Sequence, residues 1–365
     1  MKIRDLVTEI ERLAPPAYQE DYDNAGLIVG CAEREIEACL LCFDVDEKTV
    51  DEAAERGAGL IVSHHPAIFG GLKRLTGRTP TERTVEKAIR RNVALYAAHT
   101  NLDSVAGGVS ARLAEKLGLT NIRTLAPRKG LLFKLTVYTP ANHAQAVRKA
   151  MFEAGAGTIG NYDECSWNVQ GIGTFRAGEN TNPFVGTKAS MHEEAEIRTD
   201  TVVKKHELSS VLQAMVAAHP YEEPVYDVYP IENALSSVGF GAVGELPKPL
   251  PTEDFFSMLK KALDAKVIRH NRPHVAMVSR VAVCGGSGAN LVGEAMAAGA
   301  EVFVTGDCKY HSFVDTEGRL ILADAGHFET ESFAVEIFRE VISKKFPTFA
   351  VHTAGNMYNP VEYFL

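Results

Sequence analysis

The sequence predicts an α/β protein in which two related α/β halves form one sheet-based domain, with a smaller α+β domain inserted between them. Apolar runs typical of buried strands alternate with helical patterns over residues 1–126. The pattern changes at Phe133 and returns near Leu235 with repeated spacing. The predicted segments are 1–127 and 235–365 for the halves of the α/β domain, and 128–234 for the inserted domain.

Composition limits the class of protein. A chain of 365 residues is too long for one ordinary core and predicts two or three domains. The net charge of −9 argues against a protein that binds the phosphate backbone of nucleic acids. No apolar run approaches the roughly 18–20 residues of a membrane span, and the N-terminal pattern is an amphipathic helix instead of a secretory signal. The six cysteines lack disulfide-scaffold spacing, so we expect a cytoplasmic protein with reduced thiols.

Each element of the first half has a local signal. Residues 3–13 form an amphipathic helical pattern that Pro15 and Pro16 end. The helical pattern 109–117 is followed by Gly118, a residue expected just after a helix. Strands that alternate with helices favour a parallel sheet covered by helices. The other predicted elements are strands at 27–29, 38–43, 59–63 and 93–98, and helices at 47–56 and 82–91.

The middle segment follows a different order. Residues 133–138 alternate like a half-buried strand, and 141–154 are helical. A glycine-rich stretch follows, and then a second alternating strand at 194–204. A helix at 207–218 and a strand at 225–229 complete the segment. This order fits an inserted ferredoxin-like α+β domain.

The two halves resemble one another in spacing. Cys42 to Ser63 and Cys284 to Thr305 span the same distance, since 63 − 42 = 21 and 305 − 284 = 21. The pair His64-His65 then aligns with Gly306-Asp307. Further on, His99 to Asp103 and His327 to Glu331 each read as a histidine, three residues and an acid.

Adjacent histidines follow the predicted strand 59–63. Pro66 ends this strand, because proline has no N–H to give to a ladder. The carboxyl ends of strands are where ligands bind in open α/β sheets. Two interpretations remain open at this point: a metal site, or one histidine that caps the strand and another that is solvated.

The repeat places many potential ligands after strands that would end close together. Imidazole and carboxylate groups together suit zinc, manganese or iron, and so large a set with several acids suits two metal ions. The candidates are His64, His65, His99, Asp103, Asp307, His311, Asp324, His327 and Glu331.

Other residues give weaker signals. His219, His270, His274 and His352 lack partners in sequence. The run 285–288 (Gly-Gly-Ser-Gly) either offers backbone N–H groups to an anion or makes a tight turn. Lys309 and Arg74 would supply charge near a phosphate, although solvation is their default.

Five short motifs together resemble the Ngg-interacting-factor-three-like family, also called GTP cyclohydrolase type 2 homologues. They are Asp23-Asn-Ala-Gly-Leu27, Ser63-His-His-Pro66, His99-Thr-Asn-Leu-Asp103, Thr305-Gly-Asp307 and His327-Phe-Glu-Thr-Glu331. The middle segment, with Tyr162–Trp167 and His219–Pro224, is similar to the insert of longer bacterial members and to PII-signal and CutA proteins.

The resemblance implies a dinuclear metal site and a toroidal homohexamer. The implied ligands fall on His64, His65, Asp103, His327 and Glu331. His99 is not a usual ligand of the family, so we interpret it as a group next to the metal ligands.

The predicted function is a metal-dependent hydrolase that acts on a nucleotide-like small molecule, with GTP ring opening as the candidate reaction. Two divalent ions (zinc, manganese or iron) would activate a water molecule, and His99 or Asp307 would carry its proton. One alternative is a non-catalytic regulatory or metal-handling assembly whose insert senses a small molecule. A partner-binding adaptor is a third interpretation.

Overall fold

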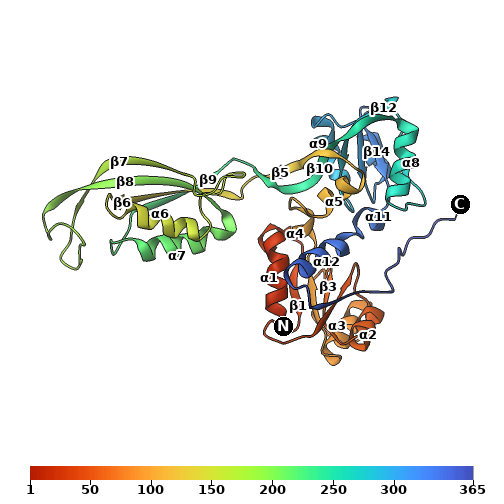
Figure 1. Ribbon diagram of the computed structural model, residues 1–365, viewed down its shortest axis with the longest axis horizontal. Helices are drawn as coiled ribbons and strands as arrows, with labels where there is room; N and C mark the ends of the chain where they lie inside the picture. The colour runs from red at the N-terminus through yellow and green to blue at the C-terminus, as the bar shows by residue number, and fades with distance from the viewer. Residues whose placement is uncertain (365) are drawn as a thin grey trace. The chain divides into compact units, whose positions relative to one another are not determined.

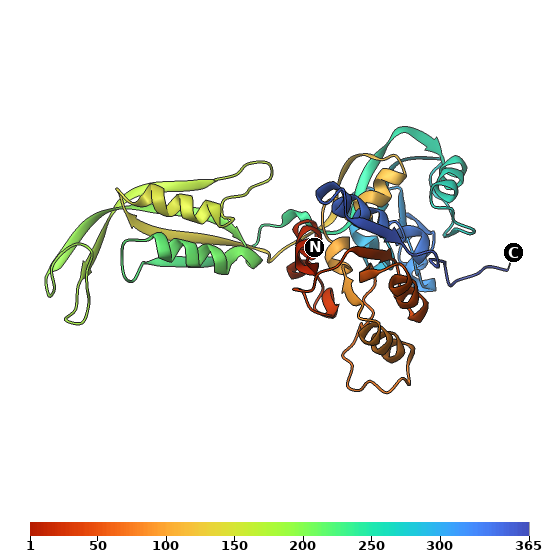
Figure 2. The ribbon, with the colours of Figure 1, turned by 60° about the horizontal axis from the view of Figure 1, so that its bottom comes forward.

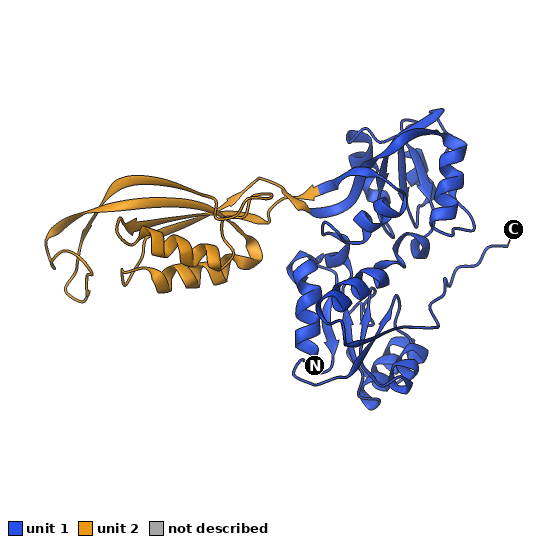
Figure 3. Cartoon of the chain, viewed as in Figure 1, with its two compact units in different colours: residues 1–126, 238–365 blue, residues 127–237 orange. Residues whose placement is uncertain are grey.

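The computed structural model describes residues 1–364 and divides into two compact units (Figure 3). Unit 1 combines residues 1–126 with residues 238–365, and unit 2 comprises residues 127–237. Within the described part of the chain, no helix has the length and apolar character that crossing a membrane requires.

The first sheet of unit 1 has the strand order β1-β4-β3-β2-β15. Its three central strands are parallel, as the alternation of strands and helices predicts. They are β2 (Ala38–Cys42), β3 (Ala58–Ser63) and β4 (Ala94–Ala97). The edge strand β1 (Gly26–Val29) is antiparallel to β4, and β15 (Ala350–Thr353) is parallel to β2. The helices of this half are α1 (Ile3–Leu13), α2 (Glu47–Glu55), α3 (Pro80–Arg90), α4 (Thr100–Asp103) and α5 (Val109–Lys116), with a 3-10 turn at Pro16–Tyr18.

The second sheet of unit 1 has the order β11-β14-β13-β12-β10-β5. Its parallel centre is formed by β12 (Met277–Val283), β13 (Val302–Thr305) and β14 (Ile321–Asp324). The flanking strands are β5 (Thr120–Arg128), β10 (Leu235–Pro251) and β11 (Arg269–His270). The helices of this half are α8 (Thr252–Ala262), α9 (Val292–Ala297), α10 (Tyr310–Val314), α11 (His327–Glu331) and α12 (Ala334–Lys345), with a 3-10 turn at Ala289–Leu291.

The two halves form one compact unit, but they build two sheets instead of one. Each sheet packs against its own buried cluster, one around Leu40 and Ile61 and the other around Phe303 and Leu322. The halves exchange edge strands, because β5 belongs to the second sheet and β15 to the first. The short helices α4 and α11 lie between the sheets in Figure 1, and both contact α5.

The strand register confirms the internal repeat and corrects one alignment. Leu41 of β2 pairs with Val62 of β3, and Val283 of β12 pairs with Val304 of β13. The second pair has residue numbers 242 higher than the first (283 − 41 and 304 − 62). In the next pair of strands, Ser63 pairs with Ala97 and Thr305 pairs with Asp324. Residues of β14 therefore carry numbers 227 higher than their counterparts in β4 (324 − 97). By this offset the counterpart of His99 is Gly326, and His327 corresponds to Thr100. The expected match of His99 with His327 is therefore wrong by one residue, because His99 precedes α4 whereas His327 is the first residue of α11.

The long strand β10 and helix α8 have no counterpart among the predicted elements. Glycine and proline recur along β10, at Gly239, Gly241, Gly244, Pro247 and Pro249, and both residues are depleted in strands. The sheet accommodates them because the pairing of β10 with β12 is interrupted between Glu245 and Leu250.

Unit 2 is a four-stranded antiparallel sheet with the order β7-β8-β6-β9. Helices α6 and α7 pack together on one face of the sheet (Figure 1), over a core that includes Leu135, Val147 and Met215. The elements follow one another as strand, helix, two strands, helix and strand. Their bounds are β6 (Leu132–Pro140), α6 (Ala144–Glu153), β7 (Ser166–Arg176), β8 (Met191–Lys204), α7 (Leu208–Ala218) and β9 (Tyr226–Ile231), with a 3-10 turn at Lys205–Glu207.

Candidate metal centre

Three strand ends of unit 1 deliver imidazoles and carboxylates to one place. The backbone N–H groups of His64 and His65 donate to carbonyls of Cys42 and Phe43, which extends the β2–β3 pairing past the last residue of β3. Asp103 lies in the short helix that follows β4. From the second half, His327 and Glu331 stand four residues apart in α11 and therefore face the same side of that helix.

These side chains form three overlapping groups in which all ligand atoms lie within 4.8 Å of one another. Two residues of the first half, His64 and His65, each belong to two groups, and so does Glu331 of the second half. The groups are His64, His65 and His99; His65, His327 and Glu331; and His64, Asp103 and Glu331.

The Glu331 carboxylate lies at the centre of this cluster. Its Oε2 atom is 2.9 Å from Nε2 of His327, 3.5 Å from Nε2 of His65 and 3.7 Å from Nε2 of His64. Glu331 is buried, with 4% of its surface exposed. A buried carboxylate requires partners of opposite charge, and the surrounding imidazoles or a metal ion fulfil that role.

Three buried atoms of the cluster have no hydrogen-bond partner of good geometry. They are Nε2 of His64, Oδ1 of Asp103 and Oε2 of Glu331, and the first two lie 3.6 Å apart. Buried polar atoms without partners are rare, and a missing ion is one explanation for them. This separation suits two ligands of one ion at the usual distances of about 2.0–2.2 Å. The residues present therefore fit a metal ion.

The second nitrogen of every histidine in the cluster is held by an oxygen acceptor. When such an imidazole is neutral, as a metal ligand must be, Nδ1 carries the proton in this contact and Nε2 keeps a lone pair directed toward the cluster. Three of the acceptors are carboxylates and one is a backbone carbonyl. The Nδ1 contacts are His64 to Ala98 O (2.9 Å), His65 to Asp44 Oδ1 (2.8 Å), His99 to Asp23 Oδ1 (2.8 Å) and His327 to Asp307 Oδ2 (2.8 Å).

Burial and neighbouring charges shift the pKa values of the cluster residues in different directions. Complete burial lowers the pKa of His64 to about 3, so this imidazole is neutral and available as a ligand at pH 7. Burial opposes protonation of His65 as well, but Asp44 and Glu331 raise its pKa to about 10. The pKa of Asp103 is raised well above its ordinary value by burial and by the charge of Glu331. Without an ion, these carboxylates repel one another in a buried site.

Two partners of the histidines were not among the predicted site residues. Asp23 accepts from His99 and also from the backbone N–H of Thr100, at 3.0 Å. Asp44 lies two residues after the end of β2 and accepts from His65. In the sequence, their positions could have identified both residues, because Asp23 lies in a polar turn and Asp44 follows a strand.

The other predicted candidates lie outside the three groups. Asp307 contacts the cluster through Nδ1 of His327. Asp324 is buried and forms an ion pair with Arg269. His311 is exposed on α10 beside Tyr310, and His219 of unit 2 bonds the carbonyl of Tyr138.

The run 285–288 is a tight turn that packs on α11. The N–H groups of Gly286 and Gly288 donate to the hydroxyls of Thr330 and Thr305, at 3.0 and 2.9 Å, and that of Gly285 donates to Ser110 at 3.5 Å. The anion-binding interpretation is wrong for these three amides, because their hydrogens are already used.

A cavity of about 650 Å³ opens beside the cluster within unit 1. Its walls include His65, His99, Asp103, His327 and Glu331. This volume is in the range of small-molecule sites. The remaining lining residues are Glu20, Tyr22, Pro66, Phe69, Thr100, Phe240, Cys284, Gly285, Ser287, Gly288, Asn290 and Leu291.

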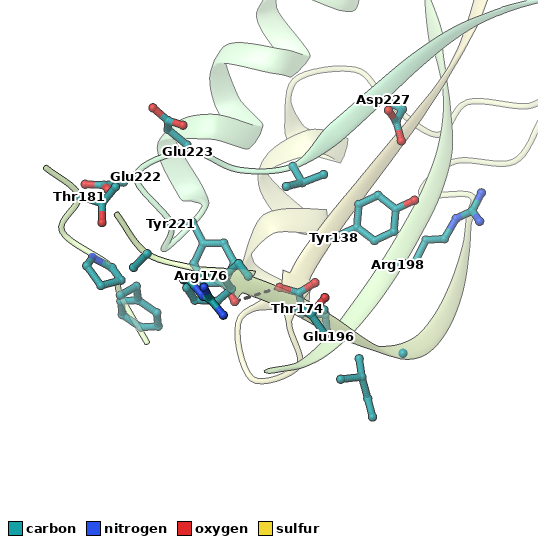
Figure 4. Close-up of a pocket in the computed structure, with 18 of the residues that line it drawn as sticks. Tyr138, Thr174, Arg176, Thr181, Glu196, Arg198, Tyr221, Glu222, Glu223 and Asp227 are labelled. Carbon is teal, nitrogen blue, oxygen red and sulfur yellow. Dashed lines mark hydrogen bonds between the residues drawn. The ribbon is translucent and has the colours of Figure 1, made fainter. Parts of the chain in front are cut away.

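Unit 2 has a separate cavity of about 640 Å³ (Figure 4). The ring of Tyr221 forms part of its wall, and the Tyr221 hydroxyl donates to Oε1 of Glu196 at 2.9 Å. Arg198 and Asp227 lie on the side of Tyr138 in Figure 4. This cavity contains no residue of the metal cluster.

The sequence profile described as Duf34/NIF3 (NGG1p interacting factor 3) matches residues 1–360. The chain belongs to this family. A protein from Halalkalibacterium halodurans named GTP cyclohydrolase 1 type 2 homolog is 40% identical, over 90% of this chain and 89% of that protein. A protein of the same name from Bacillus subtilis is 37% identical, over 94% of this chain and 91% of its own length.

Solved structures of the NIF3 family agree with the fold. A Bacillus cereus protein related to NIF3 superposes with a TM-score of 0.84 at 34% identity, covering 100% of this chain and 99% of that one. The Staphylococcus aureus protein SA1388 has a TM-score of 0.77 at 27% identity, with 100% and 99% coverage. The resemblance inferred from the five motifs is thereby confirmed at the level of the family.

Proposed function

We propose that unit 1 binds two divalent metal ions, and that His64, His65, Asp103, His327 and Glu331 are their ligands. The observation that carries this proposal is the overlap of the ligand groups. His64 and Asp103 form one group with Glu331, His65 and His327 form another with it, and Glu331 therefore belongs to both groups. A carboxylate has two oxygen atoms and can bridge two ions. Mixed imidazole and carboxylate ligands suit zinc, manganese or iron.

The reaction that we propose is metal-dependent hydrolysis of a nucleotide-like small molecule, with GTP ring opening as the candidate. A pair of bound divalent ions would supply an activated water at neutral pH and a clamp for the substrate. The names of the relatives from Halalkalibacterium halodurans and Bacillus subtilis support this candidate. We place the substrate in the cavity of about 650 Å³ beside the cluster.

The geometry supports different roles for the two predicted proton carriers. His99 lines this cavity, and Asp23 holds its Nδ1 at 2.8 Å, so its Nε2 is free to accept a proton from a water molecule. Asp307 is not among the lining residues of this cavity and instead holds His327. We assign proton transfer to His99 and orientation of His327 to Asp307.

A turnover assay with metal-loaded protein tests the reaction. We expect GTP consumption by the wild type, and a loss of about 100-fold or more in His99→Gln at unchanged metal content. His274→Ala is the matched control, because His274 is exposed and lies outside the cluster. Intact GTP in the presence of fully metallated protein, in an assay where a known cyclohydrolase opens it, would refute this reaction.

Unit 2 favours a second candidate function, a metal-binding regulatory assembly without catalysis. Its own cavity is lined by residues of unit 2 alone and has the size of a ligand site. Small molecules that raise the melting temperature through unit 2 without forming a product would support this function. Loss of that shift in Tyr221→Ala, but not in His99→Gln, would assign the ligand to unit 2.

The order and pairing of its elements support a ferredoxin-like fold for unit 2, of the PII/CutA kind. We accordingly retain residues 1–127, 128–234 and 235–365 as the proposed domain segments. The toroidal homohexamer and the cytoplasmic location, with all six thiols unpaired, are further proposals. Light scattering tests the assembly, since a monomer at micromolar concentration would contradict a stable hexamer.

A further inference from the structure

Two exposed aromatic rings form one wall of the cavity beside the metal cluster. Tyr22 and Phe69 are 64% and 54% exposed, and both line this cavity. Their ring centroids are 6.2 Å apart with an interplanar angle of 40°, and the Phe69 ring is 5.9 Å from that of His99. Exposed apolar groups gathered at a cavity are typical of binding sites, because water solvates them poorly.

Hydrogen bonds join this aromatic wall to the metal cluster. Phe69 lies in the long connection between β3 and α3, which Figure 2 shows, and Tyr22 lies in the turn before β1. The side-chain amide of Asn24 donates to the carbonyl of Ile68 at 2.7 Å, so the turn and the connection are tied together. Asp23, next to Tyr22, accepts from His99. The two rings are therefore held beside the residues that would act on a ligand.

The lining side chains of this cavity are not those that usually hold a triphosphate. Its lining includes the acids Glu20, Asp103 and Glu331, and none of the described residues that line it is a lysine or an arginine. Phosphate groups are recognised mainly by arginine, lysine and oriented N–H groups. Arg74 and Lys309, the two cations considered from the sequence, are exposed and lie outside the lining.

Polar side chains of the cavity suit the edge of a heterocycle. Ser287 and Asn290 are exposed and line the cavity, and their side chains make no hydrogen bond within residues 1–364. A serine hydroxyl and an asparagine amide each offer both a donor and an acceptor. Ring nitrogens and exocyclic oxygen or amino groups are the complementary partners.

We propose that the ligand of this cavity is a planar nitrogen heterocycle of the nucleobase or nucleoside class, recognised through its ring and not through phosphate. Its face stacks on Tyr22 and Phe69, and its edge bonds Ser287 or Asn290. The inference rests on the proposed function and narrows its substrate from a nucleotide to the ring. Stacking on aromatic side chains accepts any base, so the wall alone does not choose among bases.

Equilibrium dialysis with metal-loaded full-length protein tests the proposal. The probes are guanosine, adenosine, cytidine, GTP and inorganic triphosphate. We expect at least one nucleoside to bind as tightly as GTP does, and triphosphate to leave its binding unchanged. Tyr22→Ala and Phe69→Ala should each weaken nucleoside binding about tenfold, in line with the usual contribution of one stacking ring. Phe69→Tyr keeps a ring and should keep the affinity.

Tyr358→Ala is the matched control, since Tyr358 is also 64% exposed but lies outside the cavity. Metal content and oligomeric state are measured for every variant. The proposal is overturned if no nucleoside binds, if triphosphate displaces the nucleoside, or if the ring variants bind normally. It is also overturned if they lose affinity only by losing metal or changing assembly. Ring-dependent binding without any product would instead refute the hydrolase and leave the ligand class standing.

Discussion

The histidines of the metal centre are oriented by the oxygen atoms that hold their second nitrogen. Each acceptor fixes the tautomer and the ring plane, so the Nε2 atoms converge before any ion is bound. The acceptors come from the first half for three histidines and from the second half for His327. Orientation of the ligands is thus built by each half from its own residues.

Asp44→Asn tests this orientation. The substitution removes the charged acceptor of His65 while leaving the ligand in place, so we expect metal affinity to fall by roughly 10–100-fold. Competition with a coloured chelator measures the change. Asp315→Asn, at an exposed acid outside the three ligand groups, is the control for loss of one negative charge. Equal affinities in both variants would show that His65 needs no charged partner.

At the residue scale, the sequence predicted the groups that converge but not those that hold them. His64, His65 and Asp103 follow strands whose ends meet at the same sheet edge, and that rule needs only the order of elements. Asp23 contacts His99 across 76 positions of sequence. Such a contact depends on the path of the first turn through space, which local spacing does not specify.

The elements that carry the ligands are short, so their positions depend on close backbone packing. Gly286 has a positive φ of 58° and lies against Glu331 of α11. A side chain at this position would meet the Glu331 carboxylate, and the left-handed conformation would add strain.

Gly286→Ala should displace Glu331 and reduce bound metal by at least half, as measured by elemental analysis. Gly293→Ala is the matched control, because Gly293 lies in α9 with open space where the methyl group would go. That variant should keep its metal, and its stability should stay equal or rise by up to about 1 kcal/mol, since alanine favours a helix over glycine. Full metal content in Gly286→Ala would mean that α11 adapts to the added methyl group.

Helix α2 offers a test of local stability away from the cluster. Asp46 accepts from the backbone N–H of Thr49 at 2.7 Å and caps the helix. Asp46→Ala should lower the free energy of unfolding by about 1 kcal/mol at pH 7, whereas Asp46→Asn keeps the acceptor and should cost less.

The pH dependence of this cap follows from its pKa. Burial alone would raise the pKa of Asp46, but the hydrogen bonds from Thr49 lower it below the ordinary value. The contribution of the charge is therefore complete above the pKa of the unfolded chain, and it is lost as pH falls through the lower folded value. Denaturant titrations of wild type and Asp46→Asn at pH 7 and at pH 2, below the ordinary pKa of an aspartate, should converge at the lower pH. A constant difference would contradict a role for the charge.

Helices and strands were predicted most accurately where the apolar residues follow one clear periodicity. The helix at residues 3–13 has the predicted bounds. The neighbouring strands β2, β3 and β4 differ from their predicted ranges by at most one residue at either end. Strand β10 was missed because glycine and proline interrupt its pattern, and its stability comes from pairing with β12 and β5. Pairing with partner strands determines whether such a segment forms a strand, and those partners are distant in the sequence.

At the scale of the whole molecule, the two halves are interlocked by exchanged edge strands. The chain reaches β15 only after the second half is complete, and β15 then pairs with β2 of the first sheet. Repeat spacing predicted two related halves but not this exchange, because β15 is four residues long and has no counterpart in the repeat. The metal cluster, which takes ligands from both halves, depends on the interlocked unit.

Removal of unit 2 tests whether unit 1 is sufficient for metal binding. Strands β5 and β10 are neighbours in one sheet, so a short glycine-serine linker from residue 128 to residue 235 should close the chain. We expect the shortened protein to fold and to retain the metal content of the full chain. Circular dichroism and elemental analysis check the two parts of this expectation. A folded protein without metal would assign unit 2 a role in the centre.

The most direct test of the central claim is metal content per chain by elemental analysis, for the wild type, His64→Ala, Glu331→Ala and His274→Ala. The account predicts about two transition-metal ions per chain in the wild type and in the exposed control His274→Ala. His64→Ala should lose one ion or more, and Glu331→Ala should lose both because its carboxylate belongs to both groups. A wild-type protein that carries no metal and takes up none on titration would contradict the account.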